Sequence, residues 1–187
     1  MFYDLEDPLS FMNQVYEVLA DDGVWVFEQS YMPGMLGMNA YDTICHEHLE
    51  YYRLKQIKWM ADRVGFRIVD VGLSMVNGGS FSVMLAKSGS RHVESTDLVE
   101  SFLGREEALG LATLTPYRQF RRQVEDHREE LRGLMRRIKT NGESIIGLGA
   151  STKGNVILQF CGLTRDDIPS IAEVNKDKFG RLTPGTH

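Results

Sequence analysis

The chain has few cysteines, no excess of basic residues and no long apolar run, and each of these features excludes a class of protein. Its 187 residues include two cysteines, Cys45 and Cys161. Two cysteines so far apart give no disulfide framework, so a reducing compartment such as the cytoplasm is expected. The formal net charge of -5 argues against a nucleic-acid partner, because such proteins carry a basic surface. No stretch is typical of a signal peptide or a membrane span, so no membrane partner is expected either.

Residues 41–52, Tyr-Asp-Thr-Ile-Cys-His-Glu-His-Leu-Glu-Tyr-Tyr, concentrate titratable and aromatic side chains. This mixture is typical of proton chemistry in a partly dry pocket. In an extended segment His46 and His48 would share one face, and Cys45 and Glu47 the other. Three interpretations stay open: a histidine base oriented by a carboxylate, a metal site completed by a ligand from elsewhere, and a polar loop at a domain boundary.

The start of the chain predicts a helix followed by a strand. Asp7 and Pro8 are typical of an N-cap and a first helical residue, and apolar residues recur at helical spacing over residues 8–20. The apolar run Val24–Phe27 then predicts a buried parallel strand.

The residues after this strand are candidates for a pocket, since ligands bind beyond the carboxyl ends of strands in open α/β sheets. The candidate substrate-binding residues there are Gln29, Ser30 and Tyr31, next to Glu28. Residues 32–40, rich in Met and Gly, favour a flexible lid, with a surface loop that buries some Met side chains as the alternative.

The next segment predicts a helix and a hairpin. Residues 53–65 carry a helical apolar face, and residues 66–73 and 80–86 alternate as strands around the turn Asn77-Gly78-Gly79. Asn77 is either a ligand contact or only the residue that such a turn favours.

A change of composition at Ser88-Gly89-Ser90 predicts a boundary between two domains, residues 1–88 and residues 89–187. A long helix is predicted from Thr115-Pro116 to the stop signal Asn141-Gly142.

A second α/β unit is predicted near the end of the chain. A strand over residues 144–148, a glycine-rich turn and a helix over residues 155–161 precede another parallel strand over residues 170–174. This last strand places Glu173 near the turn as a further candidate substrate-binding residue. In the turn, Gly147 and Gly149 allow backbone amides to approach an anion, and Lys153 adds a positive charge.

Two other interpretations of this turn stay open. It could only pack the helix on the sheet, or it could bind NAD with Glu173 on the ribose. Thr152 stands where the third glycine of an NAD-binding turn is expected, which argues against the second.

Four stretches resemble one family in order and spacing, over nearly the whole chain. They are Tyr41–Tyr52, Asn77-Gly78-Gly79-Ser80, Gly147–Asn155 and Ala172–Thr186. The chain resembles the S-adenosylmethionine-dependent C-methyltransferases that act on nucleotide-linked deoxysugars. The resemblance implies an α/β fold, namely the C-terminal half of a Rossmann-like methyltransferase domain followed by a second Rossmann-like domain. Members also have a zinc-binding region and a glycine loop for S-adenosylmethionine, and neither is matched here, so a truncated fragment is expected.

The resemblance also implies roles for single residues. His48 is expected to be the base, with Glu47 beside it and Cys45 where the family often has Tyr. Tyr3 is expected at the substrate and Asp4 at the cofactor.

The implied reaction removes the C3 proton of a 4-keto sugar, and the enolate then takes the methyl group of S-adenosylmethionine. A histidine with an ordinary pKa of about 6.5 suits this step near neutral pH. No metal is needed for it, and zinc is expected only in the unmatched region. The alternatives are a non-catalytic nucleotide-binding domain and an NAD-dependent enzyme. The oligomeric state does not follow from the sequence.

Overall fold

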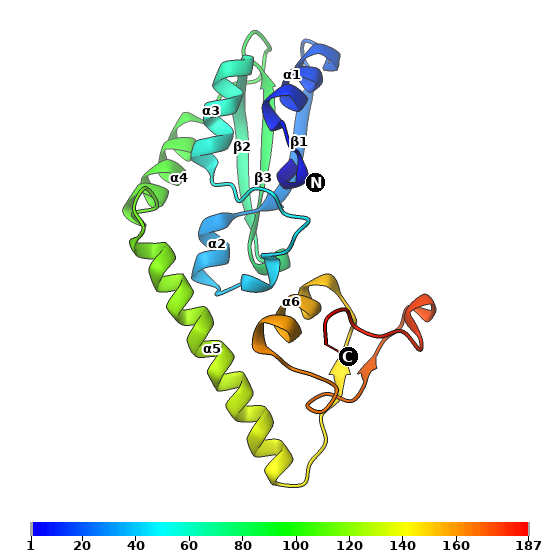
Figure 1. The fold of residues 1–187 in the computed structure, drawn as a ribbon. Helices are drawn as coiled ribbons and strands as arrows, with labels where there is room; N and C mark the ends of the chain where they lie inside the picture. Colours follow the sequence, from blue (N-terminus) through cyan, green and yellow to red (C-terminus); the bar gives the residue numbers. More distant parts are fainter. Residues whose placement is uncertain (1, 187) are drawn as a thin grey trace. The chain divides into compact units, whose positions relative to one another are not determined.

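The computed structural model describes residues 2–186, and the chain has a mixed α/β fold, as predicted (Figure 1). It divides into two compact units. The first contains Met1–Ala40 and His46–Arg118, and the second contains Tyr41–Cys45 and Gln119–His187. The domain boundary expected at residues 88 and 89 stays a prediction. Within the described range, no helix combines the length and the apolar character that crossing a membrane requires.

The first unit is built on a three-stranded sheet in the order β1-β3-β2. Its strands are β1 (Val24–Ser30), β2 (Phe66–Ser74) and β3 (Ser80–Lys87). All pairings are antiparallel, so the prediction of a buried parallel strand at β1 is wrong in its direction. The side chains of β1 alternate, with Val24 and Val26 exposed and Gln29 buried, because only one face of this strand packs against the core.

Three helices contribute to this core. They are α1 (Pro8–Val18), α3 (Leu54–Val64) and α4 (Thr96–Ala108). The predicted start of α1 is confirmed, because the Asp7 side chain accepts a hydrogen bond from the Ser10 amide at 2.9 Å. Gly65 ends α3 with φ of 99°, a conformation that glycine adopts without steric cost.

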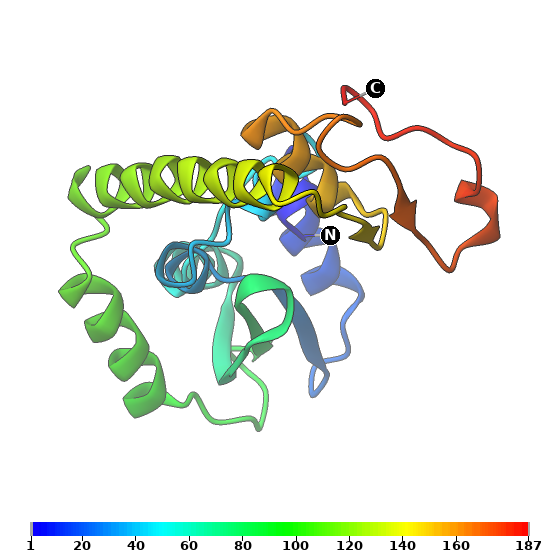
Figure 2. The ribbon, with the colours of Figure 1, turned by 90° about the horizontal axis from the view of Figure 1, so that it is seen from below.

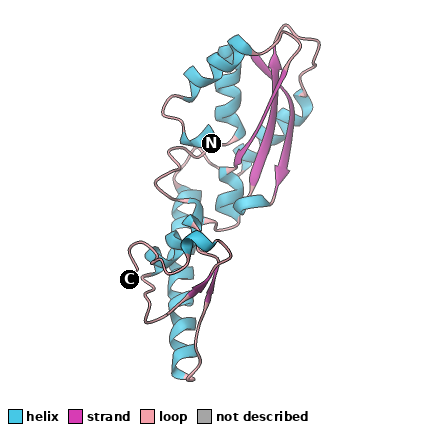
Figure 3. Ribbon diagram, turned by 90° about the vertical axis from the view of Figure 1, so that its right-hand side faces the viewer, coloured by secondary structure: helices cyan, strands magenta, loops and turns pink. Residues whose placement is uncertain are grey.

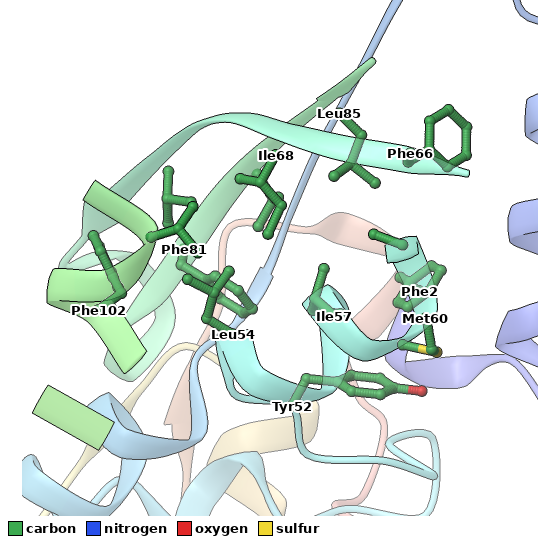
Figure 4. Close-up of a cluster of buried hydrophobic side chains, with 14 of the residues drawn as sticks. Phe2, Tyr52, Leu54, Ile57, Met60, Phe66, Ile68, Phe81, Leu85 and Phe102 are labelled. Carbon is green, nitrogen blue, oxygen red and sulfur yellow. The ribbon is translucent and has the colours of Figure 1, made fainter. Parts of the chain in front are cut away.

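Side chains from α3 and the sheet interlock in the core of the first unit. Figure 4 shows Leu54, Ile57 and Met60 of α3 facing strand residues that include Ile68 and Leu85. Each fully buried side chain of this size contributes about 1.5–3 kcal/mol through the hydrophobic effect. The core therefore holds β1 and the loop before α3 in place.

Residues 32–40 differ from the expected flexible lid. Met32–Gly37 form the helix α2, and Met32 and Met35 are buried. Pro33 lies in the first turn, where a missing amide hydrogen costs nothing. The periodic Met side chains thus serve as packing groups.

The second unit contains most of α5 (Thr115–Thr140) and a small parallel sheet. The strands β4 (Gly147–Leu148) and β5 (Ile171–Ala172) pair in parallel and are joined through α6 (Thr152–Cys161). Figure 3 shows these two short strands, and Figure 2 shows α6 beside α5, where Arg132 donates a hydrogen bond to the Cys161 carbonyl. The predicted strand–turn–helix–strand order is confirmed, with strands of two residues each.

Candidate functional site

His48 lies against the N-terminal 3-10 helix η1 (Phe2–Asp4) of the first unit. The amides of Leu49 and Glu50 both donate hydrogen bonds to the Tyr3 carbonyl at 3.1 Å. The His48 ring is half-buried, and its centroid lies 4.3 Å from that of Tyr3 and 6.3 Å from that of Tyr51. The structure therefore brings two predicted site residues, Tyr3 and His48, into contact.

The residues just before His48 do not form the expected extended segment. Residues 45–47 make a bend and a turn, so their side chains do not alternate as in a strand. His46 and Glu47 are exposed, whereas Cys45 is half-buried and belongs to the second unit. Both cysteines carry free thiols.

Gln29 is a buried polar residue near the carboxyl end of β1. Only 3% of it is exposed, and neither its amide nitrogen nor its amide oxygen has a hydrogen-bond partner among residues 2–186. It lies two residues after Phe27 on the same strand, and the Phe27 ring centroid lies 5.1 Å from that of Phe2 in η1. Buried amides are nearly always paired in folded proteins, so this one is available to a ligand.

Ser30 and Tyr31 follow Gln29 and are oriented by protein contacts. Ser30 is half-buried and pairs with Ser80 of β3. The Tyr31 ring packs 4.9 Å from Phe81, and its hydroxyl donates a hydrogen bond to Glu106 at 3.0 Å. Burial, together with the neighbouring Glu106 carboxylate, raises the pKa of Tyr31.

Glu106 on α4 was not identified by sequence reasoning. It is 1% exposed, and its Oε1 accepts hydrogen bonds from the Tyr31 hydroxyl and from the Leu54 amide at 2.6 Å. Its Oε2 accepts from the Lys55 amide at 3.2 Å. Its sequence neighbours are typical of a charged helix surface, so no local signal indicated its burial.

The Asn77-Gly78-Gly79 turn packs on α2. Asn77 lies in the short 3-10 helix η3 (Val76–Gly78), and the Gly79 carbonyl accepts a hydrogen bond from the Tyr31 amide at 3.1 Å. A Cβ atom at Gly79 would lie 3.1 Å from the Gly34 Cα, so this close approach requires glycine.

Asp4 ends η1 and is exposed. It is the predicted cofactor contact and directly follows Tyr3 in the chain. Within residues 2–186, no three His, Cys, Asp or Glu side chains gather in a group that could hold a metal ion.

In the second unit, the glycine-rich turn is held by an internal carboxylate. Glu173 accepts hydrogen bonds from the amides of Ala150 at 2.7 Å, Val174 at 2.8 Å and Asn175 at 3.0 Å. These three hydrogen bonds lower the pKa of the Glu173 carboxyl to about 2, and the bond from the Asn175 amide has the largest effect. Nζ of Lys178 lies 3.8 Å from Oε2 of the same carboxylate.

The predicted glycines and lysine of this turn lie around the start of α6. Gly149 has φ of 83°, and Gly147 faces Ile171 so closely that a Cβ atom would lie 2.8 Å from it. The Ser151 hydroxyl caps α6 by accepting from the Gly154 amide at 3.0 Å. Lys153 follows in the first turn of the helix and is half-buried.

A pocket of about 380 Å³ opens at this end of the second unit. Part of its lining is apolar, and the remainder is polar or charged, with three basic residues and the Glu173 carboxylate. The polar and charged lining residues are Ser151, Thr152, Asn155, Thr164, Arg165, Ser170, Glu173, Lys178, Arg181, Thr183 and Thr186. This mixture suits a ligand with a ring system and an anionic group.

Tyr41, the first residue of the segment 41–52, forms a cluster with His127 and Cys161 in the second unit. Its hydroxyl lies 3.0 Å from Nδ1 of His127 and 3.5 Å from Sγ of Cys161. Burial, with the Cys161 thiol beside it, raises the pKa of Tyr41. Neither His127 nor Cys161 was identified as a partner from the sequence.

Comparison with known proteins finds matches on both parts of the chain. The family described as "C-methyltransferase C-terminal domain" matches residues 75–187, and the family described as "Methyltransferase domain" matches residues 1–71. C-methyltransferase NovU of Streptomyces niveus is 34% identical over 185 residues, which are 99% of this chain and 44% of NovU. The chain thus spans less than half the length of this relative, which agrees with the expectation of a longer parent protein.

Proposed function

This chain belongs to the C-methyltransferase family, and we propose that its parent protein transfers a methyl group from S-adenosylmethionine to C3 of a nucleotide-linked 4-keto-deoxysugar. The observation that carries this proposal is the His48 imidazole, half-buried against Tyr3 and held there by the two hydrogen bonds to the Tyr3 carbonyl. The unpartnered amide of Gln29 in the same unit supports it.

His48 acts as the general base in this proposal. A carbon next to a ketone becomes nucleophilic only after it loses a proton, and an imidazole accepts a proton near neutral pH. The aromatic rings of Tyr3 and Tyr51 beside His48 reduce access of water to the imidazole. Glu47 follows from the resemblance as the accompanying carboxylate, and it is exposed in the turn just before His48.

The residues of the first unit fit one side of a cofactor site. When bound, S-adenosylmethionine supplies an electrophilic methyl group. The Asp4 carboxylate accepts hydrogen bonds from hydroxyl or ammonium groups. The Gln29 amide, predicted to contact the substrate, offers both a donor and an acceptor that no described residue uses.

The second unit supplies the nucleotide-binding element of the proposal. The charged pocket and the start of α6, with Lys153, favour the diphosphate of the nucleotide. Glu173 contributes by holding Gly149 and Ala150 in place, since its oxygens already accept three amide hydrogen bonds. That occupancy also argues against NAD, whose ribose would need the same oxygens. The parallel pair β4–β5 linked by α6 supports a second Rossmann-like domain.

Replacement of His48 by Asn in the full-length protein tests the base assignment. Turnover is expected to fall by roughly a hundredfold or more, because proton removal loses its base. The affinity for S-adenosylmethionine, measured by calorimetry, is expected to stay unchanged.

His46→Asn is the matched control, because His46 is exposed in the turn two residues earlier. It should retain turnover. Near-normal turnover in His48→Asn, or an equal loss in both variants, would remove His48 from the base role.

A further inference from the structure

Glu106 is the most buried carboxylate of the first unit, and no role has been assigned to it. It lies on α4, outside every stretch that carries the family resemblance. Ionised carboxylates are rarely buried without partners, because desolvation disfavours the charged form. Here a hydroxyl and two backbone amides supply three hydrogen bonds.

These three donors come from two separate segments. The Tyr31 hydroxyl belongs to the residues that follow β1, immediately after Gln29 and Ser30. The Leu54 and Lys55 amides are the first two of α3, where a negative charge is favoured by the helix dipole. The loop that enters α3 at this point is the one that carries His48.

A backbone contact joins the same two segments. The Met32 amide donates a hydrogen bond to the Tyr52 carbonyl at 2.9 Å. Glu106 and this bond together link the segment of Gln29 to the segment of His48. One buried carboxylate and one backbone hydrogen bond thus connect the segment that follows Gln29 to the segment that follows His48.

We propose that Glu106 is a positioning residue for methyl transfer, acting by tying Tyr31 and the start of α3 together. This inference rests on the proposed function. A displacement of about 1 Å of a reacting group can lower a rate by roughly a hundredfold, so loss of the tie acts on turnover more than on binding.

Glu106→Gln in the full-length protein tests the inference. The Gln side chain has the same size as Glu, but its NH₂ group must face the N–H of Leu54 or of Lys55. Two donors cannot form a hydrogen bond with each other, so one bond of the tie is lost. We expect kcat to fall roughly ten- to a hundredfold, while the KM for the methyl donor changes less than about twofold. Hydrogen exchange of the Leu54 and Lys55 amides should accelerate in the same variant.

Asp7→Asn is the matched control, since Asp7 caps α1 through the Ser10 amide and is not part of the site. It should leave kcat unchanged even if the melting temperature falls. If Glu106→Gln does not fold, Tyr31→Phe tests the inference instead. This variant removes the hydrogen bond from the Tyr31 hydroxyl to Glu106, while Glu106 still accepts hydrogen bonds from the Leu54 and Lys55 amides. A lower kcat with unchanged KM in Tyr31→Phe supports the inference, and an unchanged kcat overturns it.

The outcomes separate this inference from the proposed function. An inactive wild-type protein contradicts methyl transfer itself. An active wild type, an inactive His48→Asn and a fully active Glu106→Gln overturn the role of Glu106 alone.

Discussion

Two buried polar residues of the first unit differ in how their hydrogen-bonding groups are satisfied. Glu106 is 1% exposed and accepts three hydrogen bonds, whereas Gln29 is 3% exposed and has none from residues 2–186. An unpaired buried polar group costs about 1–3 kcal/mol of folding stability. Such a cost persists in proteins mainly at sites where function requires it. At Gln29, a substitution that raises the free energy of unfolding should therefore weaken ligand binding.

Replacement of Gln29 by Met should show this opposition. Met has a similar length and no unpaired donor or acceptor, so the free energy of unfolding should rise by about 1 kcal/mol in urea titrations. Binding of the nucleotide-linked sugar or of S-adenosylmethionine to the full-length protein should weaken in the same variant. Gln14→Met, at an exposed position of α1, should change neither quantity. A destabilised Gln29→Met would show that the amide has a structural partner.

At the scale of elements, the β4–α6–β5 unit combines very short strands with a carboxylate that connects its loops. Its strands have two residues each, and Leu148 is exposed. Glu173 instead connects the turn after β4 to the residues after β5 through three amide hydrogen bonds. The geometry of the glycine-rich turn should therefore depend on pH.

The sign of this dependence follows from the lowered pKa of Glu173. Its folded value is about 2, against an ordinary value of 4.5, so the ionised form stabilises the fold. That stabilisation is fully present above about pH 4.5 and is lost as the pH falls towards 2. The difference in unfolding free energy between wild type and Glu173→Gln should therefore be constant above pH 5 and shrink below it.

Glu143→Gln, at an exposed position after α5, is the control and should show no such dependence. Urea unfolding monitored from pH 2 to pH 8 measures all three proteins. A difference for Glu173→Gln that stays constant down to pH 2 would contradict the role of the charge.

At the scale of the whole molecule, the chain carries the proposed base, and most of the S-adenosylmethionine site is predicted to lie outside it. In the first unit, Asp4 is the residue predicted to contact S-adenosylmethionine, whereas Gln29 is predicted to contact the substrate. The glycine-rich turn that is proposed to bind an anion lies in the second unit, around Gly149. The chain spans 44% of the length of NovU.

The chain of 187 residues should therefore bind S-adenosylmethionine far more weakly than the full-length protein does. Titration calorimetry should detect no heat of binding at concentrations that saturate the full-length protein. The full-length protein under identical conditions is the control. Saturable binding of S-adenosylmethionine by the 187-residue chain, with an affinity comparable to that of the full-length protein, would contradict this expectation.

Sequence reasoning predicted the elements of the fold better than their pairing. The helix α1 was predicted from Asp7 and Pro8, and the hairpin was predicted from Asn77-Gly78-Gly79, because a cap or a turn depends on a few neighbouring residues. The direction of β1 was predicted wrongly, since an apolar run such as Val24–Phe27 fits a parallel or an antiparallel neighbour. For residues 32–40 the sequence left a flexible lid and a surface loop with buried Met open. Only the fold shows that Met32 and Met35 are buried, because burial depends on what lies opposite each side chain.

The sequence by itself determined the starts of α1 and α5 and the hairpin turn, and it indicated His48, Tyr3 and Gln29 as residues of interest. Only the tertiary structure decided which of these meet and which polar groups stay unpaired. Glu106 reaches Tyr31 and Leu54 across 75 and 52 residues of chain. Contacts over such separations depend on how the sheet and helices pack together, because the pattern around each residue carries only local conformational preferences.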